Sequence, residues 1–145
     1  MFNVKKELKE TLSLVATELS PLDYFRIMTG KISLYYALIT ELLIDWYYYF
    51  ENQHDNVDDV DKLVGMQILA RVKNIKLENK PLIPNELYIV LAKLFKGRDL
   101  ALHKSAVYIL SNQNDDYTDL MRTFLGLYSK FAEAYLELKK IDKTI

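Results

Sequence analysis

Apolar residues recur at steps of three and four along most of this chain, which is the spacing of one face of an α-helix. Short polar or proline-containing segments divide this pattern into five helical stretches. No stretch alternates apolar and polar residues as a half-buried strand does. The sequence therefore predicts an all-α fold, a bundle of about five helices with no sheet.

A helix-start signal separates the first two predicted helices. The first covers residues 3–19, and its apolar side consists of Val4, Leu8, Leu12, Val15 and Leu19. Ser20 as N-cap, Pro21 at the first helical position and Asp23 in the first turn are typical of a new helix. This second helix is predicted to end near residue 52 and to be the central helix. Its apolar stripe is Phe25, Met28, Ile32, Tyr35, Ile39, Leu42, Trp46 and Tyr49.

Three more helices follow in the remaining sequence. The third begins near Asn56, and its apolar stripe is Val60, Val64, Ile68, Val72 and Ile75. Two prolines in residues 80–84 end it, and a fourth starts at Pro84 or Asn85 with Leu87, Leu91, Leu94 and Phe95 inward. The fifth follows a polar turn at residues 111–114 and carries Tyr117, Met121, Phe124, Tyr128, Phe131, Tyr135 and Leu138. We expect a core that includes Phe25, Ile32, Ile39, Leu42, Phe124 and Phe131.

Length and composition narrow the class of protein. A chain of 145 residues fits one domain, residues 1–145, that buries a core without disulfides or metal. The absence of cysteine excludes disulfides and thiolate sites, and the first ten residues mix charge with apolar residues, unlike a signal peptide. Residues 32–50 are apolar, but Glu41 and Asp45 within them favour a core helix over a membrane span. We therefore expect a cytoplasmic protein with no membrane partner.

Arg98 interrupts the apolar rhythm of the fourth helix. After Leu87, Leu91 and Leu94, the next position that faces the core is Arg98. An unpaired buried guanidinium is costly, so this side chain needs an anion, a carboxylate or an opening to solvent. The plain alternative is an arginine near a helix end whose charged group reaches water while its stem covers apolar surface.

A local basic patch surrounds this arginine, although the whole chain has a net charge of only −1. The patch consists of Lys93, Lys96, Arg98, His103 and Lys104, around the single acid Asp99. Because there is no global field to attract nucleic acid, any contact with RNA must come from such a patch. The other interpretation of these lysines is a solvated helix face.

Arg98 and His103 form an Arg-x4-His motif, which reads Arg-Asp-Leu-Ala-Leu-His-Lys from Arg98 to Lys104. In this respect the chain resembles the HEPN superfamily, helical domains with such a motif late in the chain. Many members have Asn directly after the Arg and Gly directly after the His, where this chain has Asp99 and Lys104. A subfamily with Tyr two positions after the His is not matched, because Ser105 stands there. The layout of two long helices, a glycine-bearing helix and a proline-started motif helix is similar as well.

The resemblance implies a metal-independent endoribonuclease, of the toxin or phage-defence kind, that acts as a homodimer with two motifs in one cleft. No metal and no cofactor would be needed, since the 2′-hydroxyl of RNA is the nucleophile. Arg98 would hold the phosphate and His103 would transfer the proton, with Asp99 as the neighbour that orients one of them. Lys93, Lys96 and Lys104 would bind RNA phosphate. The partners would be RNA, a second copy, and a cognate antitoxin or other partner protein.

Two features leave alternatives open. Residues five apart on a straight helix point about 140° away from each other, so Arg98 and His103 can share a ligand only through a bend, for which Gly97 is a candidate, or through a second subunit. Asp99 beside a phosphate would repel it unless Arg98 or a lysine engages it. The alternative function is a non-enzymatic HEPN-like module that binds a nucleotide or a partner, and a third interpretation is an unrelated bundle with both residues on its surface.

The remaining histidine and the aromatic run carry weaker indications. His54 lies in a polar loop and is interpreted as exposed, without an assigned role. Residues 46–50 are five adjacent aromatics, which cover every side of a helix, so some must face away from the core. Such a surplus indicates a subunit interface, with base stacking as the alternative.

Overall fold

The computed structural model describes residues 2–15, 20–51, 64–111 and 118–145, and every structural statement here concerns those residues. They form the helices α1 (Val4–Val15), α2 (Pro21–Glu51), α4 (Gly65–Val72), α5 (Asn85–Ser111) and α6 (Thr118–Asp142). A hairpin of two short strands, β1 (Lys76–Leu77) and β2 (Lys80–Pro81), lies between α4 and α5. The predicted all-α bundle of about five helices is confirmed.

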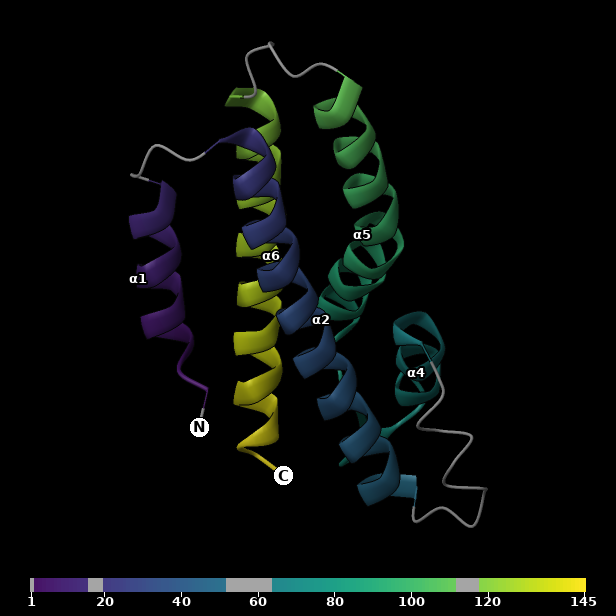
Figure 1. Ribbon diagram of the computed structural model, residues 1–145. Coiled ribbons are helices and arrows are strands. Elements are labelled where there is room, and N and C mark those ends of the chain that lie inside the picture. The colour runs from purple at the N-terminus through teal and green to yellow at the C-terminus, as the bar shows by residue number, and fades with distance from the viewer. Residues whose placement is uncertain (1, 16–19, 52–63, 112–117) are drawn as a thin grey trace.

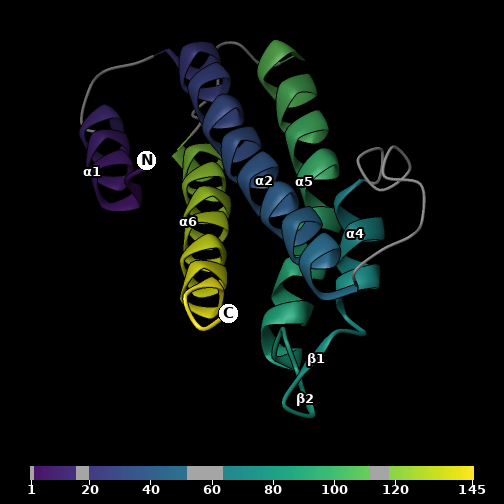
Figure 2. The same ribbon diagram turned by 90° about the horizontal axis from the view of Figure 1, so that it is seen from below.

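The bundle is organised around α2. Figure 1 shows α2 crossing in front of α6, with α5 along one side of this pair and α1 at the opposite edge. The view from below in Figure 2 shows α4 beside the late part of α2 and next to α5, with the hairpin extending beyond the end of the bundle. Helix α2 packs against α4, α5 and α6, which makes it the central helix that the apolar pattern predicts.

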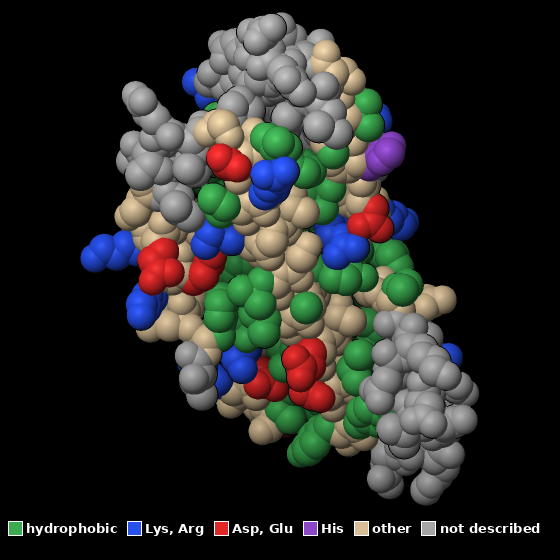
Figure 3. All heavy atoms as spheres, viewed as in Figure 1, with side chains coloured by type: hydrophobic (Ala, Val, Ile, Leu, Met, Phe, Trp, Pro, Cys, Tyr) green, Lys and Arg blue, Asp and Glu red, His purple; other side chains and the backbone are tan. Residues whose placement is uncertain are grey.

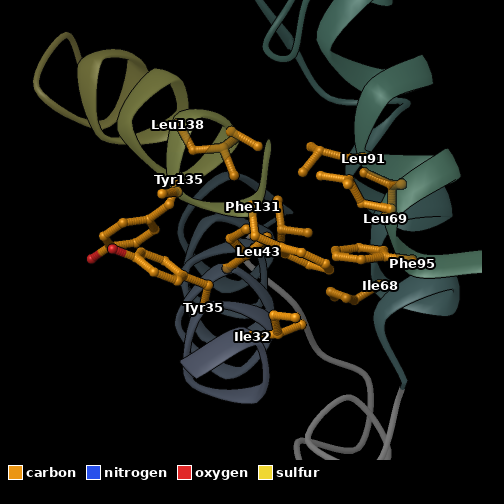
Figure 4. Packing of buried hydrophobic residues seen from close by; sticks show 14 of the residues in the cluster. Ile32, Tyr35, Leu43, Ile68, Leu69, Leu91, Phe95, Phe131, Tyr135 and Leu138 are labelled. Atoms are coloured by element: carbon orange, nitrogen blue, oxygen red, sulfur yellow. The ribbon is translucent and has the colours of Figure 1, made fainter. Parts of the chain in front are cut away.

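Two helical stripes supply most of the core. Helix α2 buries Tyr24, Met28, Ile32, Tyr35, Ile39, Leu43, Trp46 and Tyr47, and α6 buries Phe124, Tyr128, Phe131, Tyr135 and Leu138. Figure 4 shows Leu43 and Phe131 in the middle of this core, between Leu138 of α6 and the side chains that α4 and α5 contribute. Burial of such large apolar side chains contributes about 1.5–3 kcal/mol each, so this layer supplies the main stabilising term.

The phase of the α2 stripe differs from the predicted one at three positions. Phe25 and Leu42 are half-buried rather than buried, and Tyr49 is 68% exposed. Tyr24 and Leu43 take the inner places of Phe25 and Leu42, and the Tyr24 hydroxyl donates to the carbonyl of Met121 at 3.3 Å. The pattern was ambiguous because apolar residues stand side by side at these places, Tyr24 next to Phe25 and Leu42 next to Leu43, so neighbouring phases fit equally well. Ile32, Ile39, Phe124 and Phe131 are buried as predicted.

The hairpin is the element that the sequence pattern missed, so the expectation of no sheet is wrong at residues 76–81. Lys76 faces Pro81 and Leu77 faces Lys80, and the turn residues Glu78 and Asn79 have positive φ angles of 53° and 65°. Left-handed backbone at both turn positions is usually supplied by glycine, and this turn contains none. Strands of two residues also have no room for an alternating pattern.

The boundaries of the first, second, fourth and fifth predicted helices agree with those of α1, α2, α5 and α6 where the structure describes them. The third predicted helix is too long, because α4 covers only Gly65–Val72 and leaves Val64 and Ile75 of the predicted stripe outside it. Ser20 caps α2 by accepting a hydrogen bond from the Asp23 amide at 3.2 Å. The predicted end of the first helix at Leu19 and the predicted start of the third near Asn56 lie outside the described residues. Within the described part, the third predicted helix corresponds to α4, and Val64 at its N-cap is 58% exposed.

Helix α2 is also the one described helix, over Leu22–Glu51, that is long and apolar enough to cross a membrane. Only its length and its apolar composition meet the criteria for a membrane span, and the central helix of a helical bundle can meet both. Here the helix has such a role, since its inner stripe packs against α6.

Candidate functional site

Arg98 lies at the boundary between α5 and α2, with its side chain 19% exposed. Its guanidinium carbon is 3.7 Å from the centroid of the Tyr36 ring. Its Nε and Nη2 groups donate to one carboxylate oxygen of Asp99, at 2.9 and 2.6 Å. Arg98 thus has the carboxylate partner that its place in the apolar rhythm calls for, and an aromatic face adds a cation–π contact.

Tyr36 is held in place by two other elements. Its ring packs edge to face on Phe95 of α5, with centroids 5.3 Å apart, and its hydroxyl accepts a hydrogen bond from the Gly65 amide at 2.9 Å. A Cβ atom on Gly65 would lie 2.9 Å from the Tyr36 ring and hydroxyl and 3.1 Å from Phe95. A larger residue would need the Tyr36 ring to shift, so the glycine lets the N-terminus of α4 pack against the ring that supports Arg98.

His103 lies on the same helix but in a different setting. Its side chain is exposed, and no described residue hydrogen-bonds to it or forms an ion pair with it. Helix α5 remains continuous through Gly97, and a Cβ there would meet no atom within 4 Å. Figures 1 and 2 show that α5 changes direction along its length while its ribbon stays unbroken. A continuous helix turns residues five apart to sides about 140° apart, so Arg98 and His103 of one chain do not face one small ligand.

The surface around the motif carries mixed charge. Lys93, Lys96 and Lys104 are exposed, as is Asp99, whose side chain is 78% exposed. Figure 3 shows basic and acidic side chains interspersed over this face, with the purple histidine at its edge and no large field of one sign. No three His, Asp or Glu side chains gather as a metal site in the part of the chain that the structure describes.

A second polar cluster, which the sequence analysis did not single out, joins α1 to α2 and α6. The Glu7 carboxylate accepts hydrogen bonds from Lys31 Nζ at 2.7 Å, from the Tyr35 hydroxyl at 2.8 Å and from the Tyr128 hydroxyl. The fully buried Thr11 hydroxyl lies 3.1 Å from both the Glu7 carboxylate and the Tyr128 hydroxyl. In the sequence, Glu7 is only an acidic residue in a helix with one apolar face. An exposed surface glutamate would give the same pattern, so the pattern does not predict the cluster.

These contacts shift the ionisation of the cluster in a consistent way. Burial of Glu7 acts to raise the pKa of its carboxyl, but the hydrogen bonds from Lys31, Tyr128 and Tyr35 outweigh it and the pKa is lowered. Burial and the hydrogen bond to Glu7 raise the pKa of Tyr128 to about 12 and shift the pKa of Tyr35 upward as well. Both tyrosines therefore remain protonated donors to an ionised carboxylate over the physiological range.

The aromatic run at the end of α2 divides between core and surface. Trp46 and Tyr47 are buried, and Trp46 Nε1 donates to an Asp142 carboxylate oxygen at 2.8 Å. Tyr49 points outward, and its ring packs edge to face on the half-buried Phe50 at 5.0 Å. Of the five rings, Tyr48 and Phe50 are half-buried and only Tyr49 is exposed, so the outward surplus is small.

A comparison with known protein families, curated proteins and solved structures finds no match for this chain. Its function therefore has to be argued from the residues themselves.

Proposed function

We propose that this protein is a metal-independent endoribonuclease that acts as a homodimer, with Arg98 holding the scissile phosphate and His103 transferring the proton. The observation that carries the proposal is the setting of Arg98. The guanidinium is held between the Tyr36 ring and Asp99, yet part of it stays open to solvent. An oriented cation of this kind can bind a phosphate with little loss of side-chain entropy.

The hydrogen-bonding capacity of Arg98 is not exhausted. Arginine has more N–H donors than the two that bind Asp99, and it stays protonated at any physiological pH. The remaining donors can bind two oxygens of a phosphodiester and stabilise the charge that builds on them as the 2′-hydroxyl attacks. The Tyr36 ring shields one face of the guanidinium from water, which strengthens this interaction.

Asp99 does not stand as an unneutralised charge beside the phosphate. Its carboxylate is engaged by Arg98, which is the condition under which an acid at this position is compatible with an anionic substrate. Because its side chain is largely exposed, water also screens the charge of Asp99 from a bound phosphate. Lys93, Lys96 and Lys104 would bind flanking phosphates.

The dimer supplies the missing geometry. In an isologous dimer that pairs the two α5 helices, His103 of one protomer can approach Arg98 of the other. His103 is exposed, and an imidazole in its neutral form can take the proton from the 2′-hydroxyl. We place such an enzyme in the cytoplasm, as a toxin or phage-defence ribonuclease with a cognate antitoxin or other partner protein.

A second candidate function is a non-enzymatic module that binds a nucleotide or a partner protein. One observation favours it: no described residue orients the His103 ring, whereas Arg98 is already paired with Asp99. A general base usually has a neighbour that fixes its tautomer and direction. In this alternative Arg98 would bind phosphate and His103 would have no chemical role.

Cleavage of single-stranded RNA in the presence of a chelator tests the proposal. Replacing the exposed His103 by alanine should lower the cleavage rate about 10²- to 10⁴-fold, because proton transfer is lost while the fold is kept. Arg98→Ala should have a comparable effect, and Lys5→Ala, at an exposed residue of α1 on the opposite edge of the bundle, should leave the rate unchanged. Full activity in the His103→Ala/Arg98→Ala double variant would refute the proposal that these residues catalyse RNA cleavage. Absence of cleavage by the wild type, with nucleotide binding that Arg98→Ala weakens, would establish the second candidate instead.

A further inference from the structure

A pocket of about 600 Å³ lies at the end of the bundle where the hairpin, the start of α5 and the end of α6 meet. Its apolar lining consists of Leu77, Pro81, Leu82, Pro84, Leu87, Val90 and Ile141. Leu82 is almost completely buried, and Leu77 and Val90 are 37% and 42% exposed. The volume lies within the range of about 300–1,000 Å³ that is usual for small-molecule sites.

The apolar part of the lining is entirely aliphatic. Leucine, valine, isoleucine and proline side chains form its walls, and no aromatic ring is among its lining residues. A flat base or ring would find no stacking surface there, whereas a flexible alkyl chain can fill an irregular aliphatic space. Exposed Leu77 and Val90 on facing elements leave apolar surface that such a chain would remove from water.

The charges at the mouth select the head group of such a ligand. Glu137 and Lys140 bond to each other at 2.9 Å and offset one another. The third charged lining residue is Glu86, which is exposed and forms no ion pair with any described residue. The C-terminal end of α6 adds partial negative charge and the N-terminal end of α5 adds partial positive charge, so the charged side chains of the lining, two glutamates and one lysine, decide the sign. The mouth therefore favours a cation.

We propose that this pocket binds an aliphatic molecule with a single positively charged group, of the alkylammonium class. The alkyl chain lies between the hairpin and Val90, over Leu82 and Leu87, and the ammonium group pairs with Glu86. The proposal is independent of the ribonuclease, because the pocket is formed by the first turns of α5 and includes neither Arg98 nor His103.

Three probes with the same alkyl chain length separate the effect of shape from that of charge: octylammonium, octanoate and 1-octanol. Each is titrated into the full-length protein below its micellar or solubility limit. Binding is measured by calorimetry and by amide NMR shifts. Octylammonium should bind most tightly and 1-octanol more weakly. Val90→Gln should weaken binding of both about tenfold, because it places a polar group on the apolar wall. Glu86→Gln should weaken octylammonium alone, about two- to fivefold.

The chain offers a matched control in Ile89, the neighbour of Val90. Ile89 is 44% exposed and does not line the pocket, so Ile89→Gln should leave the affinity unchanged. Tighter binding of octanoate than of octylammonium, no binding of any probe, or equal effects of Ile89→Gln and Val90→Gln would each overturn the proposal. If an apolar peptide displaces octylammonium and binds far more tightly, the occupant of the pocket is a segment of a partner protein, and the proposal of a small molecule is wrong. RNA cleavage should be the same in Val90→Gln as in the wild type, which keeps this test separate from that of the ribonuclease.

Discussion

Glu7 and Arg98 are both charged side chains that lie where helices meet, and both contact a tyrosine. They differ in exposure and in where their partners come from. The Glu7 side chain is 11% exposed and receives its donors from α2 and α6. The Arg98 side chain is 19% exposed, and its ionic partner is its own neighbour in sequence, which is largely exposed. The first charge joins three helices, and the second is held only locally.

This difference separates a structural charge from a candidate site. The Glu7 carboxylate is saturated by Lys31, Tyr35 and Tyr128, so it has no capacity left for a ligand, and its loss would leave buried donors without a partner. Arg98 keeps free donors and an exposed partner that can move. A mutation at Glu7 should therefore act on the fold, and one at Arg98 on binding.

Replacing Glu7 by alanine is the strongest test of the structural half of the comparison. The change removes one side of a largely buried ion pair and leaves Lys31 and two tyrosine hydroxyls unsatisfied, so it should lower the free energy of unfolding by about 3 kcal/mol. Urea denaturation followed by circular dichroism measures it. Glu10→Ala, an exposed acid of the same helix, should change stability by less than about 0.5 kcal/mol. Equal effects of the two variants would mean that the cluster does not hold α1.

Gly65→Ala tests whether the fold and the Arg98 site are connected through Tyr36. The new methyl group would lie 2.9 Å from the Tyr36 ring, which is itself confined by Phe95 and Arg98. We expect a loss of about 2 kcal/mol in stability, because the gain in helix propensity offsets only part of the strain. Phosphate or RNA binding should weaken in parallel. Gly30→Ala, where a Cβ meets nothing within 4 Å, is the control and should not destabilise the protein.

Arg98→Ala tests the binding half of the comparison. Its stability cost should be only about 1 kcal/mol, since the variant loses a cation–π contact and an ion pair whose other member is exposed. RNA binding, measured by fluorescence anisotropy, should weaken strongly in the same variant. A stability loss as large as that of Glu7→Ala, with RNA binding unchanged, would reverse the roles assigned to the two residues.

The sequence predicted the helices and the place of Arg98 better than it predicted their partners. Apolar spacing suffices for α5 and α6, whose stripes alternate with polar residues, and it places Arg98 at the core boundary where the structure has it. It could not choose the phase of α2, because that helix is apolar on most sides. Tyr36 and Glu7 form hydrogen bonds with residues that are from 24 to 121 positions away in the sequence. A local sequence pattern carries no information about such contacts.

The pH dependence of stability is the smallest expected effect, and two carboxylates contribute to it with opposite sign. The pKa of Glu7 is lowered in the folded state, so its stabilising contribution is complete above the unfolded value of about 4.3 and is lost as the pH falls through the folded pKa. Burial, Glu41 and Asp142 instead raise the pKa of Asp45, so its ionisation opposes folding at neutral pH and this penalty disappears in acid.

Asp45→Asn and Glu7→Gln should therefore change the pH profile in opposite directions. In thermal unfolding, Asp45→Asn should melt slightly above the wild type at pH 7, because the repulsion from Glu41 and Asp142 is gone, and this gain should vanish below the pKa of Asp45. Glu7→Gln should melt below the wild type at pH 7, and the difference should narrow as acid protonates Glu7 in the wild type. Parallel profiles for the two variants would show that the Glu7 carboxylate is not held in its ionised form. The saturated carboxylate would then differ from Arg98 only in exposure, and the distinction between a structural charge and a binding charge would not hold in this protein.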